Sequence, residues 1–218
     1  GNASYSYTMQ VEGPLTDVSR TFVLFDGSVS GTKNPFFPFV PDSVASQLTP
    51  GQLYAFGSLS TTLTFLTSKG EVVTFCDLER IALDNQFFMT TPPVSLQNLF
   101  DIDGQEGGPD VFEALEGLGQ TLRPFDRVIL FLSHLRCRSS TAGSNQTDSI
   151  IKYELTPREL QVQQNLKKKN VRVDFFYWNG SSNMNQVGVL LSTFMSELYG
   201  TIKFLKRPNP FKLYEVIG

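Results

Sequence analysis

The alternation of two kinds of apolar segment restricts the fold of this chain more than any other feature does. Residues 21–25 and 128–132 are short, continuous apolar runs, typical of parallel strands that are buried on both faces. A third strand-like run spans residues 171–177. Segments with the helical spacing of apolar residues accompany these runs, at residues 111–118, 156–170 and 187–198. Strands that alternate with helices in this way predict right-handed crossovers and a mostly parallel sheet.

Local signals add detail at the ends of these segments. Thr156 and Glu159 have the spacing of a capping box, with a proline at the first helical position between them. Gly200 is expected to end the helix that begins near residue 187. Residues 62–66 and 71–75 are expected to be two strands around a glycine-containing turn, which predicts an antiparallel edge. Further elements are expected from local signals of the same kind, namely a helix at residues 41–48 and strands at residues 53–56 and 202–205.

These elements predict an α/β fold with three layers, in which helices cover both faces of a mostly parallel central sheet that has an antiparallel edge strand. At 218 residues, one domain is the expectation. We expect an amino-terminal extension at residues 1–18, the α/β domain at residues 19–207 and a carboxyl-terminal tail at residues 208–218. In such sheets the ligand site lies at the carboxyl ends of the central strands.

Charge and hydropathy exclude two classes of partner. The net charge is −3, and the longest basic tract is Lys167-Lys168-Lys169, so nucleic acid is not an expected partner. No apolar run approaches the roughly 18–20 residues that cross a bilayer, so we expect no membrane span in this sequence.

A short motif follows the first buried strand. Asp26, Ser28 and Ser30 are alternate residues of one turn, and their oxygen atoms are hard ligands that suit Mg²⁺ or Ca²⁺. Capping of the following segment by the same side chains is the alternative. The motif resembles the first metal-binding loop of von Willebrand factor type A (vWA) domains and integrin I domains. Residues 95–110, with their Gly-Gly-Pro-Asp turn, resemble the second loop, and the amino-terminal domain of hemicentins is the family member most similar in look.

The chain departs from that family at two of the expected metal ligands. Pro109 and Asp110 stand where the family has a threonine, so Asp110 would have to complete the second loop. Ser133 and His134 stand where the third loop has an aspartate, and an imidazole is a poor substitute for a carboxylate around Mg²⁺. The resemblance therefore implies a degenerate metal-dependent adhesion site, with no certain cofactor and Mg²⁺ or Ca²⁺ as the possible ones.

The resemblance implies a binding module rather than an enzyme. We expect an extracellular adhesion or protein-interaction domain that binds a protein partner through the loops at the carboxyl ends of the strands. Phe36 and Phe37 are candidate apolar anchors for that partner, with Pro109 and His134 on the same face, although burial of the two phenylalanines under their loop is the alternative.

Other classes of function remain as alternatives. Ser28, His134 and Asp174 could form a hydrolase triad, but the glycines around residues 27–31 are offset by one residue from the nucleophile-elbow pattern. A nucleotide-binding domain would need a glycine-rich phosphate loop after the first strand, which is absent. A structural domain of a larger surface protein, with no site of its own, is the third alternative.

The expected compartment is extracellular, either secreted or at the cell surface. Acceptor triplets for N-glycosylation begin at Asn2, Asn145 and Asn179, each beside turn-forming residues. The two cysteines, Cys76 and Cys137, could form a disulfide or be two small buried thiols.

Overall fold

The computed structural model describes residues 20–27, 51–91, 93, 96–100, 111–132, 154–178 and 184–205. The expected extension at residues 1–18, the tail at residues 208–218 and the helix at residues 41–48 lie outside these ranges. The domain boundaries therefore stay predictions.

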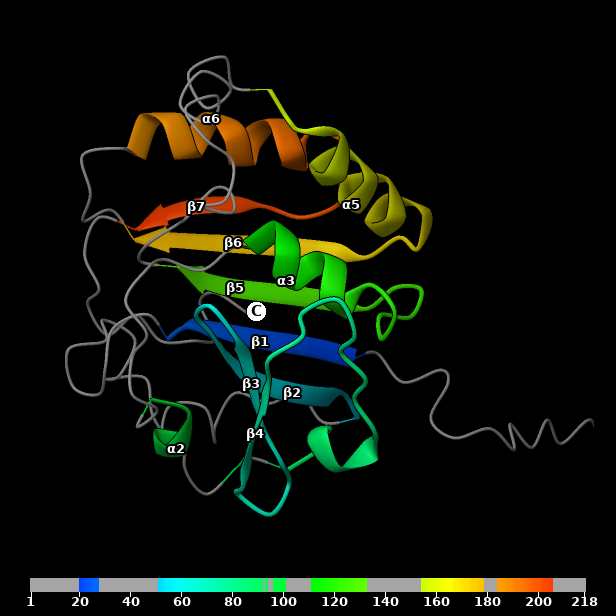
Figure 1. Cartoon of the computed structure of the whole chain (residues 1–218), viewed down its shortest axis with the longest axis vertical. Helices are drawn as coiled ribbons and strands as arrows, with labels where there is room; N and C mark the ends of the chain where they lie inside the picture. The colour runs from blue at the N-terminus through cyan, green and yellow to red at the C-terminus, as the bar shows by residue number, and fades with distance from the viewer. Residues whose placement is uncertain are drawn as a thin grey trace, which may run out of the picture.

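A single seven-stranded sheet organises the described residues, in the order β4-β3-β2-β1-β5-β6-β7 (Figure 1). The strands are β1 (Arg20–Asp26), β2 (Leu53–Leu59), β3 (Leu63–Leu66), β4 (Val72–Phe75), β5 (Arg127–Leu132), β6 (Arg172–Trp178) and β7 (Ile202–Leu205). Neighbouring strands from β2 to β7 along this order are parallel, and the β2–β3 and β3–β4 pairs are antiparallel. The predicted fold class, a mostly parallel sheet with an antiparallel edge, is confirmed.

The central strands are buried on both faces, as their continuous apolar sequences predict. In β1, Phe22 and Leu24 point to one face and Val23 and Phe25 to the other, and none of the four is exposed to solvent. Burial of each such side chain contributes about 1.5–3 kcal/mol to the free energy of unfolding. A strand of this kind can only occupy the interior of the sheet.

Three helices pack against the face of the sheet that carries Phe22 and Leu24, and share one hydrophobic core with it. They are α3 (Val111–Leu118), α5 (Pro157–Lys168) and α6 (Met184–Met195), and Figure 1 shows them over the β5–β7 half of the sheet. They contribute buried side chains to the core that contains Phe22 and Leu24, among them Leu115, Val162 and Leu190. The burial of these apolar stripes confirms the helical spacing seen in the sequence.

The start of α5 follows the predicted capping box. The Thr156 hydroxyl accepts a hydrogen bond from the Glu159 backbone N–H, and the Glu159 carboxylate accepts one from the Thr156 N–H. Along the same helix, Arg158 donates two hydrogen bonds of 2.7 Å to Glu116 of α3. The Gln163 side-chain amide donates a hydrogen bond to the Phe194 carbonyl of α6, at 2.7 Å. α5 is therefore fixed at its first turn and tied to both neighbouring helices.

The predicted end of the last helix is wrong. α6 ends at Met195, five residues before Gly200, and the chain continues through hydrogen-bonded turns. Gly200 has a φ of 131°, and a Cβ there would lie 1.7 Å from the Val173 carbonyl oxygen. Glycine is required because the chain passes close to β6 before it enters β7, so the residue serves packing and not helix termination.

Two short helices were not predicted from the sequence. They are the 3₁₀ turn η3 (Asn85–Phe87) and the single α-helical turn α2 (Gln97–Phe100), and both are too short to show a helical period. No helix of the described residues has the length and apolar character needed to cross a membrane.

Candidate functional site

The strand order reverses between β1 and β5, and the carboxyl ends of these two strands are where α/β sheets bind ligands. Asp26 is the last residue of β1 and is fully buried. The next residue, Gly27, donates its backbone N–H to the Leu59 carbonyl at the end of β2, at 2.8 Å. A Cβ at Gly27 would lie 2.1 Å from the Ser58 hydroxyl oxygen. Only glycine fits there without a shift, so β2 fixes the path along which the chain leaves β1.

Most of the predicted site residues lie outside the described residues. These are Ser28, Ser30, Phe36, Phe37, Pro109, Asp110 and His134, together with the acceptor residues Asn2, Asn145 and Asn179. Their predicted roles in metal binding, partner binding and glycosylation stay predictions. Asp26 is the one predicted metal ligand that the structure describes.

The structure describes one of the two cysteines. Cys76 follows β4 and is an exposed, free thiol, so the prediction of two buried thiols is wrong for this residue. Cys137 lies outside the described residues.

A metal site is not formed by the described residues. No group of three or more His, Cys, Asp or Glu side chains within them could hold a metal ion. Asp26 is fully buried and takes part in an interaction within the chain. Of the predicted metal ligands, the described residues therefore contain Asp26 alone, at the carboxyl edge that the carboxyl ends of β1 and β5 form, and no ligand set around it.

Asp174, the acid of the alternative hydrolase triad, is engaged elsewhere. Its carboxylate accepts hydrogen bonds from Arg127 at 2.7 Å and from the Thr201 hydroxyl at 2.9 Å, and forms an ion pair with Arg172. It lies in register with Ile129 and Val23, three residues before the end of β1. Three strand residues span about 10 Å. Asp174 therefore holds the amino-terminal half of the sheet together, and the structure does not bring it to the carboxyl edge.

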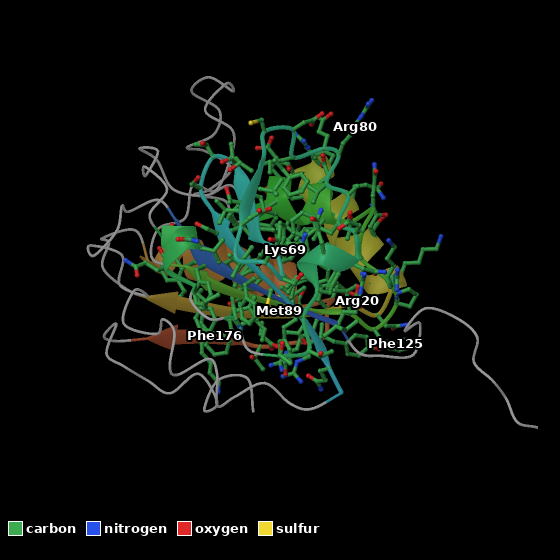
Figure 2. The ribbon with its side chains drawn as sticks, turned by 90° about the horizontal axis from the view of Figure 1, so that it is seen from below. Arg20, Lys69, Arg80, Met89, Phe125 and Phe176 are labelled. Carbon is green, nitrogen blue, oxygen red and sulfur yellow. The ribbon has the colours of Figure 1, made fainter. Side chains whose placement is uncertain are left out.

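A second buried ion pair lies at the amino ends of the strands. Arg20 of β1 and Asp126, just before β5, are both less than a tenth exposed, and the guanidinium nitrogen lies 2.6 Å from the carboxylate oxygen. Arg20 also donates a hydrogen bond to the Thr121 carbonyl, and its guanidinium group lies over the Phe88 ring. Figure 2 shows Arg20 near the exposed Phe125 of the adjoining turn. These partners satisfy the buried charge, so this pair joins β1 to β5 and has no free group for chemistry.

A row of stacked aromatic rings crosses the opposite face of the sheet, to which Val23 and Phe25 of β1 point. Phe25, Phe131 and Phe176 lie in register on β1, β5 and β6, and adjacent ring centroids are 5.2 and 5.3 Å apart. All three are buried, and Lys203 of β7 lies over the Phe176 ring. Each stacked pair adds about 0.5–1.5 kcal/mol of stability beyond the area that it buries. The sequence carries the phenylalanines but not the strand register that aligns them.

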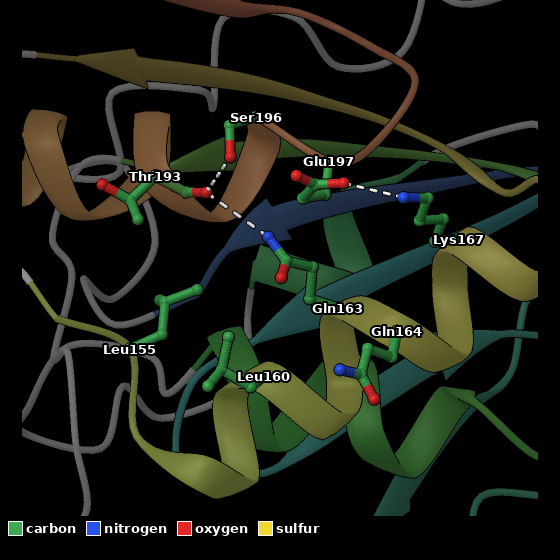
Figure 3. Close-up of a pocket in the computed structure, with 8 residues that line it drawn as sticks. All are labelled: Leu155, Leu160, Gln163, Gln164, Lys167, Thr193, Ser196 and Glu197. Atoms are coloured by element: carbon green, nitrogen blue, oxygen red, sulfur yellow. Dashed lines mark hydrogen bonds and ion pairs between the residues drawn. The ribbon is translucent and has the colours of Figure 1, made fainter.

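A groove of about 400 Å³ lies between α5 and α6 (Figure 3). Leu155 and the half-exposed Leu160 line one end, and the Lys167–Glu197 ion pair, at 2.7 Å, closes the other. A hydrogen bond from Lys167 lowers the pKa of the Glu197 carboxyl and raises the pKa of the Lys167 amine. Gln163 in the floor donates to backbone carbonyls of α6. The two hydroxyls in its lining, those of Thr193 and Ser196, donate to backbone carbonyls of α6.

Comparison with known proteins finds similar structures but no similar sequences. No protein-family model matches the sequence, and no curated protein matches it. Among solved structures, human COPII-coat protein Sec24c matches with a TM-score of 0.61 and 11% identity, covering 90% of this chain and 30% of that one. The SpRpn10 VWA domain matches with a TM-score of 0.44 and 12% identity, covering 92% of this chain and 94% of that one.

The likeness to Sec24c concerns the fold alone, because the identity is low, and the likeness to the Rpn10 domain carries no argument at its TM-score. This chain spans less than a third of the length of the Sec24c chain that it matches. The finer likeness to the hemicentin amino-terminal type finds no support in the comparisons. With its strand order, its reversal between β1 and β5 and its antiparallel edge, the chain has the vWA-like α/β fold that its sequence predicts.

Proposed function

We propose that this chain is a protein-interaction module whose partner binds at the carboxyl edge of the sheet, between the ends of β1 and β5. One observation carries the proposal. The strand order reverses at this point, and β1 ends there in a fully buried aspartate whose following glycine is held against β2. A rigid edge of this kind gives the loops that follow it fixed starting points, which favours recognition of one surface on a partner.

The acidic residue at this edge does not need a metal ion in this proposal. Asp26 is buried and engaged within the chain, and two positions of the motif carry Pro109 and His134 where the resembled family has metal ligands. Without the third-loop aspartate of the resembled family, an ion at this edge would lose one of the carboxylate charges that hard cations prefer. Partner binding is therefore expected to persist when Mg²⁺ and Ca²⁺ are removed with a chelator.

The compartment proposed for this interaction is extracellular, and it is supported by the acceptor triplets at Asn2, Asn145 and Asn179. Produced in a secretory host, the chain is expected to lose mass when treated with an amide-cleaving glycosidase. An unchanged mass would remove the support for secretion and leave the interaction proposal standing.

Replacement of both Phe36 and Phe37 by serine tests the proposed face. The partner is captured from the native source, identified and purified, and its affinity is measured for the parent chain and the double variant. The expected result is at least a tenfold loss of affinity with an unchanged unfolding midpoint. Phe125→Ser is the matched control, because Phe125 is 73% exposed and lies at the amino ends of the strands. Equal affinity of all three proteins would contradict the proposed face.

A further inference from the structure

Among the described strands, β4 has a neighbour on one side only, and the side chains of Val72, Val73 and Thr74 are exposed. β3 is the only described strand that pairs with β4, which ends the strand order opposite β7 (Figure 1). Val72 is 39% exposed and Val73 is 37% exposed. The strand carries no lysine and no proline, two residues with which sheet proteins often block an edge.

The hydrogen bonds of the hairpin turn show which backbone groups of β4 point outward. Thr67 donates its N–H to the Glu71 carbonyl at 2.7 Å, so these two residues form a hydrogen-bonded pair. Hydrogen-bonded and non-hydrogen-bonded pairs alternate along an antiparallel ladder. Val73, opposite Phe65, is therefore bonded to β3. Val72 and Thr74 belong to the non-hydrogen-bonded pairs, so their N–H and C=O groups point away from β3.

Two independent contacts agree with this assignment. The hydroxyl oxygens of Thr64 and Thr74 lie 2.9 Å apart, which suits the closer side chains of a non-hydrogen-bonded pair. On the other side of β3, Ser60 donates its N–H to the Thr62 carbonyl. Ser60 and Thr62 therefore form a hydrogen-bonded pair, and by the same alternation so do Ser58 and Thr64. The backbone N–H and C=O of Thr64 thus point toward β2 and away from β4. Val72 and Thr74 thus present a row of two donors and two acceptors at the open edge.

The rest of the hairpin is held firmly, so the open edge is already in the extended form that a new strand needs. Asn98 of α2 donates a hydrogen bond to the Gly70 carbonyl at 2.9 Å, and Ser68 donates its N–H to the Gln86 carbonyl at 2.7 Å. The Phe75 ring packs against other phenylalanines beneath the hairpin. A strand held in this way loses little conformational entropy when a partner pairs with it.

We propose that β4 binds an extended segment of a protein partner by strand addition, separately from the carboxyl edge. Exposed carboxylates lie near both ends of β4, at Glu71 and Asp77, so the segment that fits is apolar at alternate positions and basic at its ends. A second copy of β4 fits less well, because antiparallel pairing would bring Glu71 of one copy near Asp77 of the other. Strand addition draws its affinity from main-chain hydrogen bonds, and therefore tolerates many sequences.

A synthetic peptide tests this proposal directly. The probe is an eight-residue peptide of alternating valine and threonine with a lysine at each end, added to the purified chain at millimolar concentration. Amide hydrogen exchange, followed by NMR, is expected to slow at least tenfold at Val72 and Thr74. The Val73 amide serves as the internal control, because it already donates to β3 and its exchange should change much less.

Three comparisons make the outcome specific. A peptide of the same sequence with N-methylated alternate amides should give no protection, and one with glutamate ends should bind several-fold more weakly. Val72→Pro removes an outward N–H and should abolish binding, whereas Val72→Ala keeps that N–H and should retain most of it. The N-methylated peptide decides the matter even if Val72→Pro does not fold.

The contrary outcomes are equally clear. The proposal is overturned if the lysine-ended peptide leaves Val72 and Thr74 unprotected, or if the N-methylated peptide protects them equally well. Protection that rises with protein concentration in the absence of peptide would identify a second copy as the occupant and also overturn it. None of these results bears on the Phe36 and Phe37 test, so the two proposals can fail separately.

Discussion

Alanine at position 27 should disturb the carboxyl edge through a single contact. The Cβ of Gly27→Ala would lie 2.1 Å from the Ser58 hydroxyl oxygen, whereas its other nearest atoms, at 3.4 and 3.6 Å, are at ordinary contact distance. Ser58 is 5% exposed, so the oxygen cannot simply move into solvent. Overpacking of this kind costs about 1–3 kcal/mol of unfolding free energy. In a chain of this size each kcal/mol lowers the unfolding midpoint by about 2–4 °C.

The second variant of the pair removes the offending atom. Ser58→Ala deletes the hydroxyl oxygen, which makes no hydrogen bond to another described residue, so this change alone should alter the unfolding free energy by less than about 0.5 kcal/mol. In the Ser58→Ala background, Gly27→Ala should then cost little. The coupling free energy of the double-mutant cycle should equal most of the cost of the single change.

Urea unfolding of the four proteins measures this cycle, and partner affinity measured in parallel connects it to function. Because Gly27 sets the path of the chain out of β1, Gly27→Ala should weaken partner binding and the double variant should restore it. An equal cost of Gly27→Ala in both backgrounds would show that the Ser58 contact is not its cause, and would refute the reasoning.

Three further changes test the rest of the fold. Asp126→Asn removes the counter-charge of the buried Arg20 and should cost about 3–5 kcal/mol in urea unfolding, and a loss below about 1 kcal/mol would contradict the role given to the pair. Phe125 has a φ of 66° and an exposed ring, so Phe125→Gly should raise the unfolding free energy by about 0.5–1 kcal/mol, seen as a higher thermal midpoint. The Lys167–Glu197 pair lowers the pKa of the Glu197 carboxyl, so its contribution to stability should be present above the unfolded-state pKa and be lost as the pH falls through the folded-state value. Glu197→Gln should remove that part of the acid dependence, and an NMR titration with an unshifted Glu197 carboxyl would count against it.

The elements that the sequence predicts best are those whose burial leaves a pattern along the chain. β1 and β5 are continuous apolar runs because both of their faces are covered, and α5 begins at a capping box that is wholly local. Gly200 was misassigned because the glycine that ends a helix and the glycine that lets two strands approach look the same in a sequence. The distinction depends on the Val173 carbonyl, which is 27 residues away.

The site was predictable only in part, for a similar reason. Asp26 could be placed at the carboxyl edge because it follows a recognisable strand. Its surroundings could not, because the Gly27–Ser58 contact depends on the register of β1 against β2. Asp174 suits the acid of the alternative hydrolase triad by residue type alone, but its partners include Arg127 and Thr201, which only the strand pairing brings to it. The open β4 edge likewise depends on the strand order and not on a motif.

Site-specific photo-crosslinking to the purified partner tests the central claim most directly. A benzophenone amino acid is placed in turn at Phe37, at His134, at Leu160 in the α5–α6 groove and at Val72 on the β4 edge. The account predicts that the partner is crosslinked from Phe37 and His134, with or without Mg²⁺, and not from Leu160. Crosslinks confined to Leu160 or Val72 would show that the partner binds elsewhere, and would contradict the claim that the carboxyl edge of the sheet is the binding face.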